Sequence, residues 1–326
     1  MSEYINVELP FLDKLQQLDW EVINHNEKTT YSGTDHLKTA EQRVAYGQKI
    51  ASSHCIPQDP AISKRDHFRE TILTNEFRNS LKRINLTDDG RSWLTDKQID
   101  DVVREVMTHP GVGLLQANKT IHELLTKNTT ASVNELTGEQ SPLVRLIDFR
   151  NPDRNSFIAI NQFRIDTPGA SRNAIIPDIV LFLNGLPVVV IECKDNDVAE
   201  PLSEAFLQIS RYANTRDDEY GVKEGEEKLF HPNLFSIITH GTEARFGTIT
   251  GEFDHYLNWK DIFPEVYRTV QVKPDEERQE VLILGMLNKA ILLDILKNFT
   301  LFMEIKRGEL VKIVLSTTPR KCFPTV

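Results

Sequence analysis

The fold is decided by residues 176–194, which read IPDIVLFLNGLPVVVIECK. Two runs of β-branched and other bulky apolar residues, 179–183 and 186–191, lie on either side of Asn184-Gly185. An Asn-Gly pair is the strongest short-range signal for a β-hairpin, and continuous apolar runs are typical of strands buried on both faces. The stretch therefore predicts a hairpin at the centre of a sheet.

Three ionisable residues, Asp178, Glu192 and Lys194, lie at the open end of this hairpin. Burying unpaired charges is unfavourable, so these groups need a shared counter-charge or a metal ion. Asp178, Glu192 and the backbone carbonyl of Cys193 offer the oxygen ligands that Mg²⁺ prefers. Lys194 leaves the strand on the same face as Glu192, where its ammonium can act on an attacking water or on transition-state charge. The alternative is an ordinary hairpin in which Asp178 caps a turn and Lys194 is a strand-end charge.

Strand geometry adds a condition to this metal site. A two-residue turn at Asn184-Gly185 with straight strands would pair Asp178 with Ile191 and place it on the face opposite Glu192. We therefore predict one extra residue in the hairpin, most simply a three-residue loop with Gly185 in the left-handed region, or else a kink near Asp178. A regular two-residue turn with straight strands would contradict the metal site.

A helix is predicted over residues 200–214, where apolar residues recur at helical spacing. Gln208 and Tyr212 lie one turn apart beside this apolar stripe, so they can present an amide and a phenol to the same object. Taken alone, such a pair is also typical of surface polarity. Directly after a hairpin with two acids and a lysine, the pair favours a functional site.

Together, Pro177-Asp178, Glu192-x-Lys194 and Gln208-x-x-x-Tyr212 resemble the motifs of the PD-(D/E)xK nuclease superfamily. The closest resemblance is to the amino-terminal nuclease domain of the restriction (R) subunit of type I restriction-modification enzymes. Further blocks similar to that domain are Val7-Glu8-x-Pro10, Asn161-Gln162-Phe163, Asn184-Gly185-Leu186-Pro187, and Gly247-Thr248 with Trp259-Lys260.

This resemblance implies roles for single residues. Asp178 and Glu192 are similar to the family's metal ligands, with Lys194 as the catalytic lysine. Gln208 and Tyr212 are similar to a pair that supports DNA handling.

Glu8 is a candidate further acid of the site, and the alternative is an acid favoured by the start of a helix. Cys193 is expected to point away from Glu192 and Lys194 as a small core residue. The expected fold class is α/β, a mixed β-sheet flanked by helices, with a restriction-endonuclease-like core and helical additions.

The resemblance implies a Mg²⁺-dependent DNA endonuclease domain, a fragment of a type I site-specific deoxyribonuclease R subunit without sequence specificity of its own. Implied partners are DNA and the modification and specificity subunits. One alternative is a catalytically silent docking or DNA-binding module of the restriction complex, and another is a stand-alone Holliday-junction or repair nuclease. The sequence has no GxxxxGK[ST] phosphate loop, so ATP is expected to bind only to the full-length subunit. Its last residues, from about 312, do not resemble a motor domain, and we expect a fragment.

Charge and composition restrict the function and the location that can be expected. The chain has 326 residues and a formal net charge of −10, which predicts weak DNA binding by the chain alone. Basic residues gather in 64–83, either as a DNA-facing surface or as a solvated helix face. No stretch approaches the ~20 apolar residues of a membrane span, and no export signal is recognised, so we expect a cytoplasmic protein without membrane contact.

Three parts are expected along the chain: a mainly helical part over 1–130, the nuclease core over 131–270, and helices with a truncated linker towards an absent motor domain over 271–326. Helices are predicted after Asn6, over 35–52, from Ser63 or Asp66 to about 85, and over 95–109 and 279–303. Strands besides the hairpin are predicted over 143–149, 156–165, 233–240 and 245–250.

Overall fold

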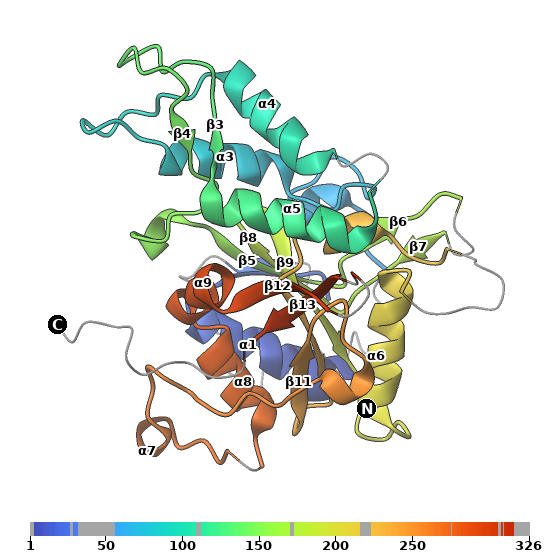
Figure 1. The fold of residues 1–326 in the computed structure, drawn as a ribbon. Coiled ribbons are helices and arrows are strands. Elements are labelled where there is room, and N and C mark those ends of the chain that lie inside the picture. Colours follow the sequence, from blue (N-terminus) through green and yellow to red (C-terminus); the bar gives the residue numbers. More distant parts are fainter. Residues whose placement is uncertain are drawn as a thin grey trace.

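A mixed β-sheet forms the centre of the molecule (Figure 1). The computed structural model describes residues 3–26, 29–31, 56–108, 112–169, 173–215, 223–274, 276–305, 308 and 310–315. In these residues the sheet has seven strands in the order β11-β10-β9-β8-β5-β1-β2. The strands are β1 (Glu21–Asn24), β2 (Thr29–Tyr31), β5 (Phe157–Asn161), β8 (Ile179–Leu183), β9 (Leu186–Cys193), β10 (Phe235–Thr239) and β11 (Ala244–Gly247).

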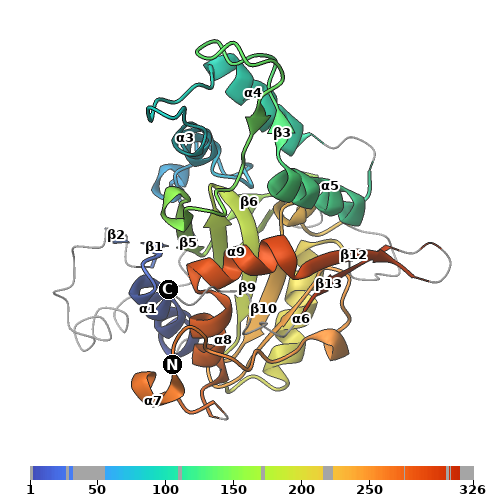
Figure 2. The same cartoon turned by 60° about the vertical axis from the view of Figure 1, so that its left-hand side comes forward.

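The strand directions make the sheet mixed. β1 runs parallel to β5, and β9 runs parallel to β10, whereas the other neighbouring pairs are antiparallel. The helices α1 (Leu9–Gln17), α8 (Arg278–Met286) and α9 (Lys289–Asn298) pack on one face, and α6 (Pro201–Tyr212) packs on the other (Figures 1 and 2). The expected fold class, a mixed sheet flanked by helices, is confirmed.

Alternation along the central hairpin produces two separate cores. Ile179 and Leu181 on β8 contribute to the core under α1, α8 and α9, whereas Val180 and Phe182 contribute to the core under α6. Each strand is thus buried on both faces, as its unbroken apolar sequence predicts. The polar groups at the hairpin's open end are therefore held by a rigid support.

A further layer contains α3 (Thr74–Ile84), α4 (Asp96–Met107) and α5 (Leu114–Lys127), with the short strands β3 (Thr129–Thr130) and β4 (Leu143–Val144) (Figure 1). Thr95 caps α4 through a capping box with Gln98, as its predicted start requires. The predicted 63–85 helix begins later, at Thr74, after the short η2 (Pro60–Ser63). The predicted helix over 35–52 lies outside the described residues.

Several predicted elements differ from the structure. The helical pattern over 279–303 forms α8 and α9, but its last residues form β12 (Thr300–Glu304), which pairs with β13 (Leu310–Val314). Thr300 and Phe302 favour strands, and a neighbouring strand is available for pairing. The predicted strand over 143–149 is reduced to β4, and the predicted strand over 156–165 divides into β5 and β6. The remaining short elements are β6 (Ile165–Asp166), β7 (Ala174–Ile175), η1 (Tyr4–Glu8), η3 (Pro152–Arg154), η4 (Glu227–Phe230), η5 (Phe253–His255) and α7 (Tyr267–Val270).

Lys312 on β13 is a buried lysine that joins the β12–β13 hairpin to the rest of the core. Its Nζ donates hydrogen bonds to Asn118 Oδ1 at 2.9 Å and to the backbone carbonyl of Asn233 at 2.5 Å. Asn118 lies on α5, so this side chain ties β13 to that helix. Burial lowers the pKa of Lys312 to about 7.

We predict that Lys312→Met weakens the dependence of stability on pH. The folded pKa of Lys312, about 7, lies below its ordinary value of 10.5. Between these pH values the unfolded chain binds a proton that the folded chain does not. The free energy of unfolding of the wild type therefore increases with pH in this range. Urea denaturation should therefore show that the free energy of unfolding increases more between about pH 7 and about pH 9.5 in the wild type than in the variant. Equal changes in both proteins would mean that buried Lys312 stays charged.

Candidate active site

The hairpin β8–β9 contains the extra residue that the site requires. Leu183 pairs with Leu186 across a two-residue turn, in which Asn184 and Gly185 have φ values of 51° and 83°. The register then shifts between Leu181 and Phe182. Phe182 pairs with Pro187, Leu181 pairs with Val189, and Val188 between them is the bulged residue. The predicted irregularity is confirmed, but the predicted three-residue loop is wrong.

Tertiary contacts explain why the turn itself stays tight. The Gly185 carbonyl accepts a hydrogen bond from Leu73 N at 2.8 Å, and a Cβ on Gly185 would lie 2.6 Å from the Leu73 carbonyl oxygen. The Asn184 side chain accepts from Ser156 N at 2.8 Å. The bulge instead begins beside Pro187, which has no N–H to contribute to a strand ladder.

The bulge brings the two predicted acids to the same face. Ile179 pairs with Ile191, so the next residues outward, Asp178 and Glu192, are neighbours across the hairpin. The Asp178 carboxylate is also held to the residue after Glu192, since Cys193 N donates to Asp178 Oδ2 at 2.8 Å. The Cys193 side chain lies in the opposite core, so its expected role as a core residue is confirmed.

Glu192 and Lys194 form a close ion pair. Lys194 Nζ lies 2.7 Å from Glu192 Oε1 and donates to the carbonyl of Cys193 at 2.8 Å. Glu192 is 1% exposed, and its other oxygen, Oε2, is buried without a hydrogen-bond partner among the described residues. Burial and then the charge of Asp178 raise the pKa of Glu192 well above its usual range. An orphaned carboxylate oxygen of this kind is suited to a cation.

Lys194 keeps its proton in this environment. Burial alone would lower its pKa, but the charges of Glu192 and Asp178 outweigh that effect and raise the pKa above its ordinary value. A lysine held beside Glu192 in this way is suited to act as a positive charge.

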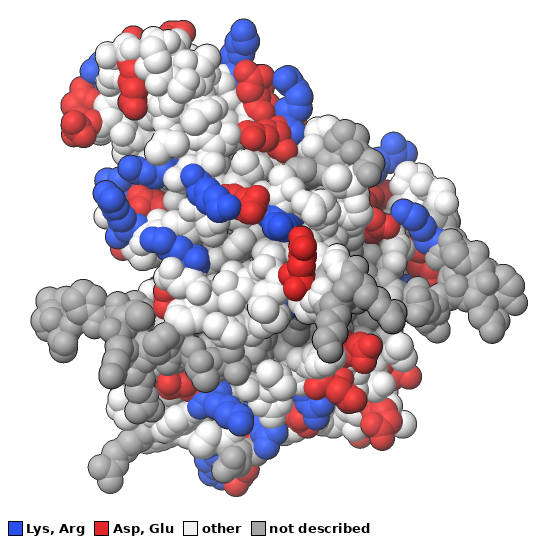
Figure 3. Space-filling view, in the orientation of Figure 1, with Lys and Arg blue, Asp and Glu red and all other residues white. Residues whose placement is uncertain are grey.

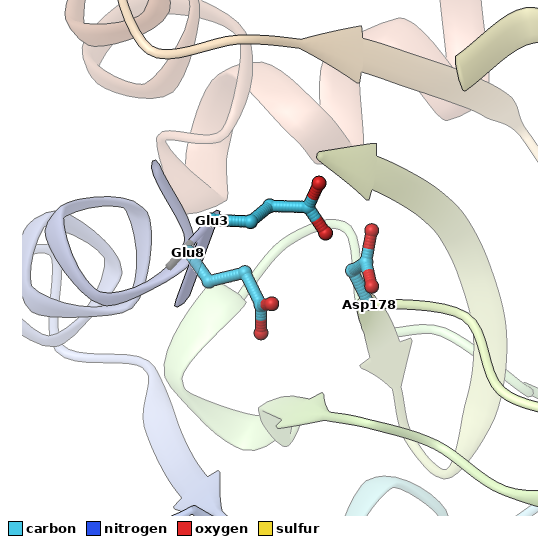
Figure 4. Close-up of side chains that lie close together, drawn as sticks. All are labelled: Glu3, Glu8 and Asp178. Atoms are coloured by element: carbon cyan, nitrogen blue, oxygen red, sulfur yellow. The ribbon is translucent and has the colours of Figure 1, made fainter. Parts of the chain in front are cut away.

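A second group of acids shares Asp178. The side chains of Glu3, Glu8 and Asp178 converge from the first helical turn and from the entrance to β8 (Figure 4). One carboxylate oxygen from each lies within 4.8 Å of the others. Asp178 therefore neighbours Glu3 and Glu8 and also the Glu192–Cys193 end of β9.

Glu3 was not foreseen because it depends on an unusual helical turn. Glu3 and Glu8 are five residues apart, which in an α-helix separates side chains by about 140° around the axis. Residues Tyr4–Glu8 form the π-helical turn η1, in which Leu9 N donates to the carbonyl of Tyr4, five residues earlier. This wider turn brings both glutamates towards Asp178, and π-helical turns are frequent at functional sites.

The three clustered carboxyls hold their protons more tightly than usual. Burial, followed by the charge of Asp178, raises the pKa of Glu3 to about 7 and that of Glu8 well above its usual range. Burial also raises the pKa of Asp178, although Lys194 opposes this effect. Carboxylates this close repel one another when ionised, and a divalent cation removes that repulsion. The all-oxygen donor set fits a hard cation such as Mg²⁺.

Gln208 and Tyr212 on α6 lie beside the chain that leads to Asp178. Gln208 Nε2 donates to the Tyr212 hydroxyl at 2.6 Å, and that hydroxyl donates to the carbonyl of Ile176 at 3.1 Å. Tyr212 is only 2% exposed. The pair is therefore hydrogen-bonded to the backbone of the residue that precedes Pro177-Asp178.

The basic region 64–83 is mostly neutralised by acids. Arg78 pairs with Asp100, and the same arrangement recurs for three other cations of this region. These pairs are Lys64 with Glu21, Lys82 with Asp96, and Arg83 with Glu76. Acidic and basic side chains are also interspersed over the face drawn in Figure 3. The structure thus favours the solvated, paired face over a free basic surface.

A mixed sheet with two carboxylates and a lysine at the end of a central hairpin defines the class of restriction-endonuclease-like folds. Comparison with known proteins gives the family. The model of the type I restriction enzyme R protein N terminus matches residues 1–255, so the chain belongs to this family.

Individual relatives agree with this assignment. The type I restriction enzyme HindI endonuclease subunit of Haemophilus influenzae is 28% identical over 276 residues, covering 84% of this chain and 24% of the relative. A putative type I restriction enzyme MjaIXP endonuclease subunit of Methanocaldococcus jannaschii is 24% identical over 203 residues, covering 62% of this chain and 18% of the relative. The chain thus spans about a quarter or less of these relatives' length.

No helix of the described residues combines the length and the apolar character needed to span a membrane.

Proposed function

We propose that this chain is a Mg²⁺-dependent endonuclease domain that hydrolyses DNA phosphodiesters. The observation that carries the proposal is the bulge at Val188, because it places Asp178 opposite Glu192. Without it, the acids would lie on opposite faces of the hairpin. In this position Asp178 lies near the Glu192–Lys194 ion pair and also near the carboxylates of Glu3 and Glu8.

The proposed ion ligands come from this set of oxygens. Asp178 is the shared ligand, Glu192 offers its orphaned Oε2, and the Cys193 carbonyl is the third candidate. Glu8 and Glu3 are further acids on the other side of Asp178. A bound Mg²⁺ would act as a Lewis acid towards a phosphoryl oxygen and lower the pKa of a coordinated water.

The remaining residues have supporting roles in the proposal. Lys194, held as a cation beside Glu192, stabilises negative charge that develops on the phosphate. Gln208 and Tyr212 fix the backbone before Asp178 and so maintain the spacing of the acids. With a net charge of −10, the chain is expected to grip DNA weakly by itself.

We further propose that DNA reaches this site within a larger restriction complex. The H. influenzae and M. jannaschii relatives are named type I restriction endonuclease subunits, and the match covers 24% and 18% of their lengths. Modification and specificity subunits would then supply sequence recognition, and ATP would act only in the longer R subunit. The proposed partners and the cytoplasmic location follow from this assignment.

Divalent-ion calorimetry on the isolated chain tests the proposal. Asp178→Asn removes the charge of the shared ligand with little change in shape, and we expect it to weaken Mg²⁺ and Mn²⁺ binding by more than about 100-fold. The matched control is Asp101→Asn, an exposed acid on α4 that pairs with Arg104. Absence of any ion-dependent heat from the wild type would instead favour a catalytically silent docking module.

A further inference from the structure

Gln162 occupies an unusual position immediately after β5. Its φ is 48°, in the left-handed region that residues other than glycine seldom adopt. The conformation is held by two backbone hydrogen bonds to the opposite segment: Gln162 N donates to the Asp178 carbonyl at 2.7 Å, and Phe163 N donates to the Pro177 carbonyl at 3.0 Å. The backbone of Gln162 is thus anchored directly to Asp178.

The side chain of Gln162 bridges two acids of the site. Its Nε2 lies 3.2 Å and 3.1 Å from the two carboxylate oxygens of Glu8 and 3.3 Å from Asp178 Oδ1. A side-chain amide carries two N–H donors, one for each acid. Glu8 and Asp178 come from segments 170 residues apart, since η1 ends at Glu8 and Asp178 precedes β8. Gln162 therefore connects them in space.

The left-handed backbone explains how this bridge forms. Consecutive residues of a regular strand point to opposite faces, so Asn161 and Gln162 should diverge. Instead, Asn161 Nδ2 also donates to Glu8 Oε2, at 3.5 Å. Backbone strain of this kind persists only where surrounding contacts enforce it, and it is concentrated at functional sites. The strain at Gln162 directs two successive amides to one carboxylate.

We propose that Gln162 is a positioning residue that holds Glu8 and Asp178 together as ligands of one divalent ion. This inference rests on the proposed nuclease function. A neutral amide suits the role because it orients both carboxylates without cancelling their negative charge, which stays available to attract a cation. A lysine in its place would neutralise the pair and compete with the ion. Groups that hydrogen-bond to metal ligands and orient them typically raise the affinity for the metal by roughly 10-fold to 100-fold.

Titration of the full chain with Mn²⁺ tests this role. Calorimetry measures the affinity for the ion, and the electron paramagnetic resonance spectrum reports the surroundings of the bound ion. Gln162→Gly deletes the amide but suits the left-handed backbone, so relief of backbone strain should offset part of the stability lost with the hydrogen bonds to Glu8 and Asp178. We expect its affinity for Mn²⁺ to fall by about 10-fold to 100-fold and the spectrum of the bound ion to change. The matched control is Gln271→Gly, which replaces an exposed glutamine with φ 59° at the end of α7.

A second variant keeps the test decisive if the glycine variant folds poorly. Gln162→Lys places an ammonium between Glu8 and Asp178, and we expect a stable protein that no longer binds Mn²⁺. Unchanged Mn²⁺ affinity and spectrum in either folded variant would overturn the positioning role. Tighter binding by Gln162→Gly would also overturn it, because the amide would then be a competitor of the ion. A wild type that binds no Mn²⁺ would instead refute the nuclease proposal itself.

Discussion

Replacing Lys194 with alanine should reduce plasmid nicking by about 100-fold or more, the loss typical when a charge-stabilising donor is removed from an active site. Lys194 is the cation paired with Glu192, and the neighbouring acids keep it protonated. Its loss removes the positive charge that would face the phosphate. Nicking of supercoiled DNA in Mg²⁺ should be measured for the chain alone and with modification and specificity subunits.

The control for this substitution is Lys14→Ala, because Lys14 forms an ion pair with Glu280 on the partly exposed surface between α1 and α8. That variant should nick DNA like the wild type. Lys194→Ala should also lower the melting temperature, since it leaves Glu192 buried without its partner. Nicking at the wild-type rate by folded Lys194→Ala would refute the proposed role of the lysine.

Local sequence patterns predicted the parts of the fold that depend on few neighbours. The β8 strand, Ile179–Leu183, and the α6 helix agree closely with the predicted ranges 179–183 and 200–214, because an unbroken apolar run specifies the strand and helical apolar spacing specifies the helix. The extra residue in the hairpin was also predictable, since it follows from alternation and from two acids that must meet. Its position at Val188 was not, because contacts of the turn with Leu73 and Ser156 decide it.

The parts of the candidate site that were missed depend on irregular backbone. Glu3 joins Glu8 only through the π-helical turn, and Gln162 reaches Glu8 only through its left-handed φ. Neither feature has a sequence period that could reveal it. The short strand β1 was missed for a related reason, because it becomes a strand through its parallel partner β5, which lies far along the chain.

The bulge lies in a run of three valines, Val188 to Val190. Removing one valine should close the bulge without moving the ends of the hairpin. Pro187 would still pair with Phe182, and the next valine would pair with Leu181, so Asp178 would stay opposite Glu192. We expect the shortened protein to be less stable, by roughly 1.5–3 kcal/mol for one buried valine, yet to bind Mn²⁺ within a few-fold of the wild type.

Adding a fourth valine is the matched opposite change. If the single bulge persists, Asp178 pairs with Ile191 and faces away from Glu192. If the bulge closes instead, the two acids are displaced by two residues along the strand, about 7 Å. Either register separates the ligands, so the lengthened protein should lose Mn²⁺ binding while circular dichroism still shows a folded sheet. Loss of binding in the folded shortened protein would contradict the dependence on register, because that protein keeps Asp178 and Glu192 on one face.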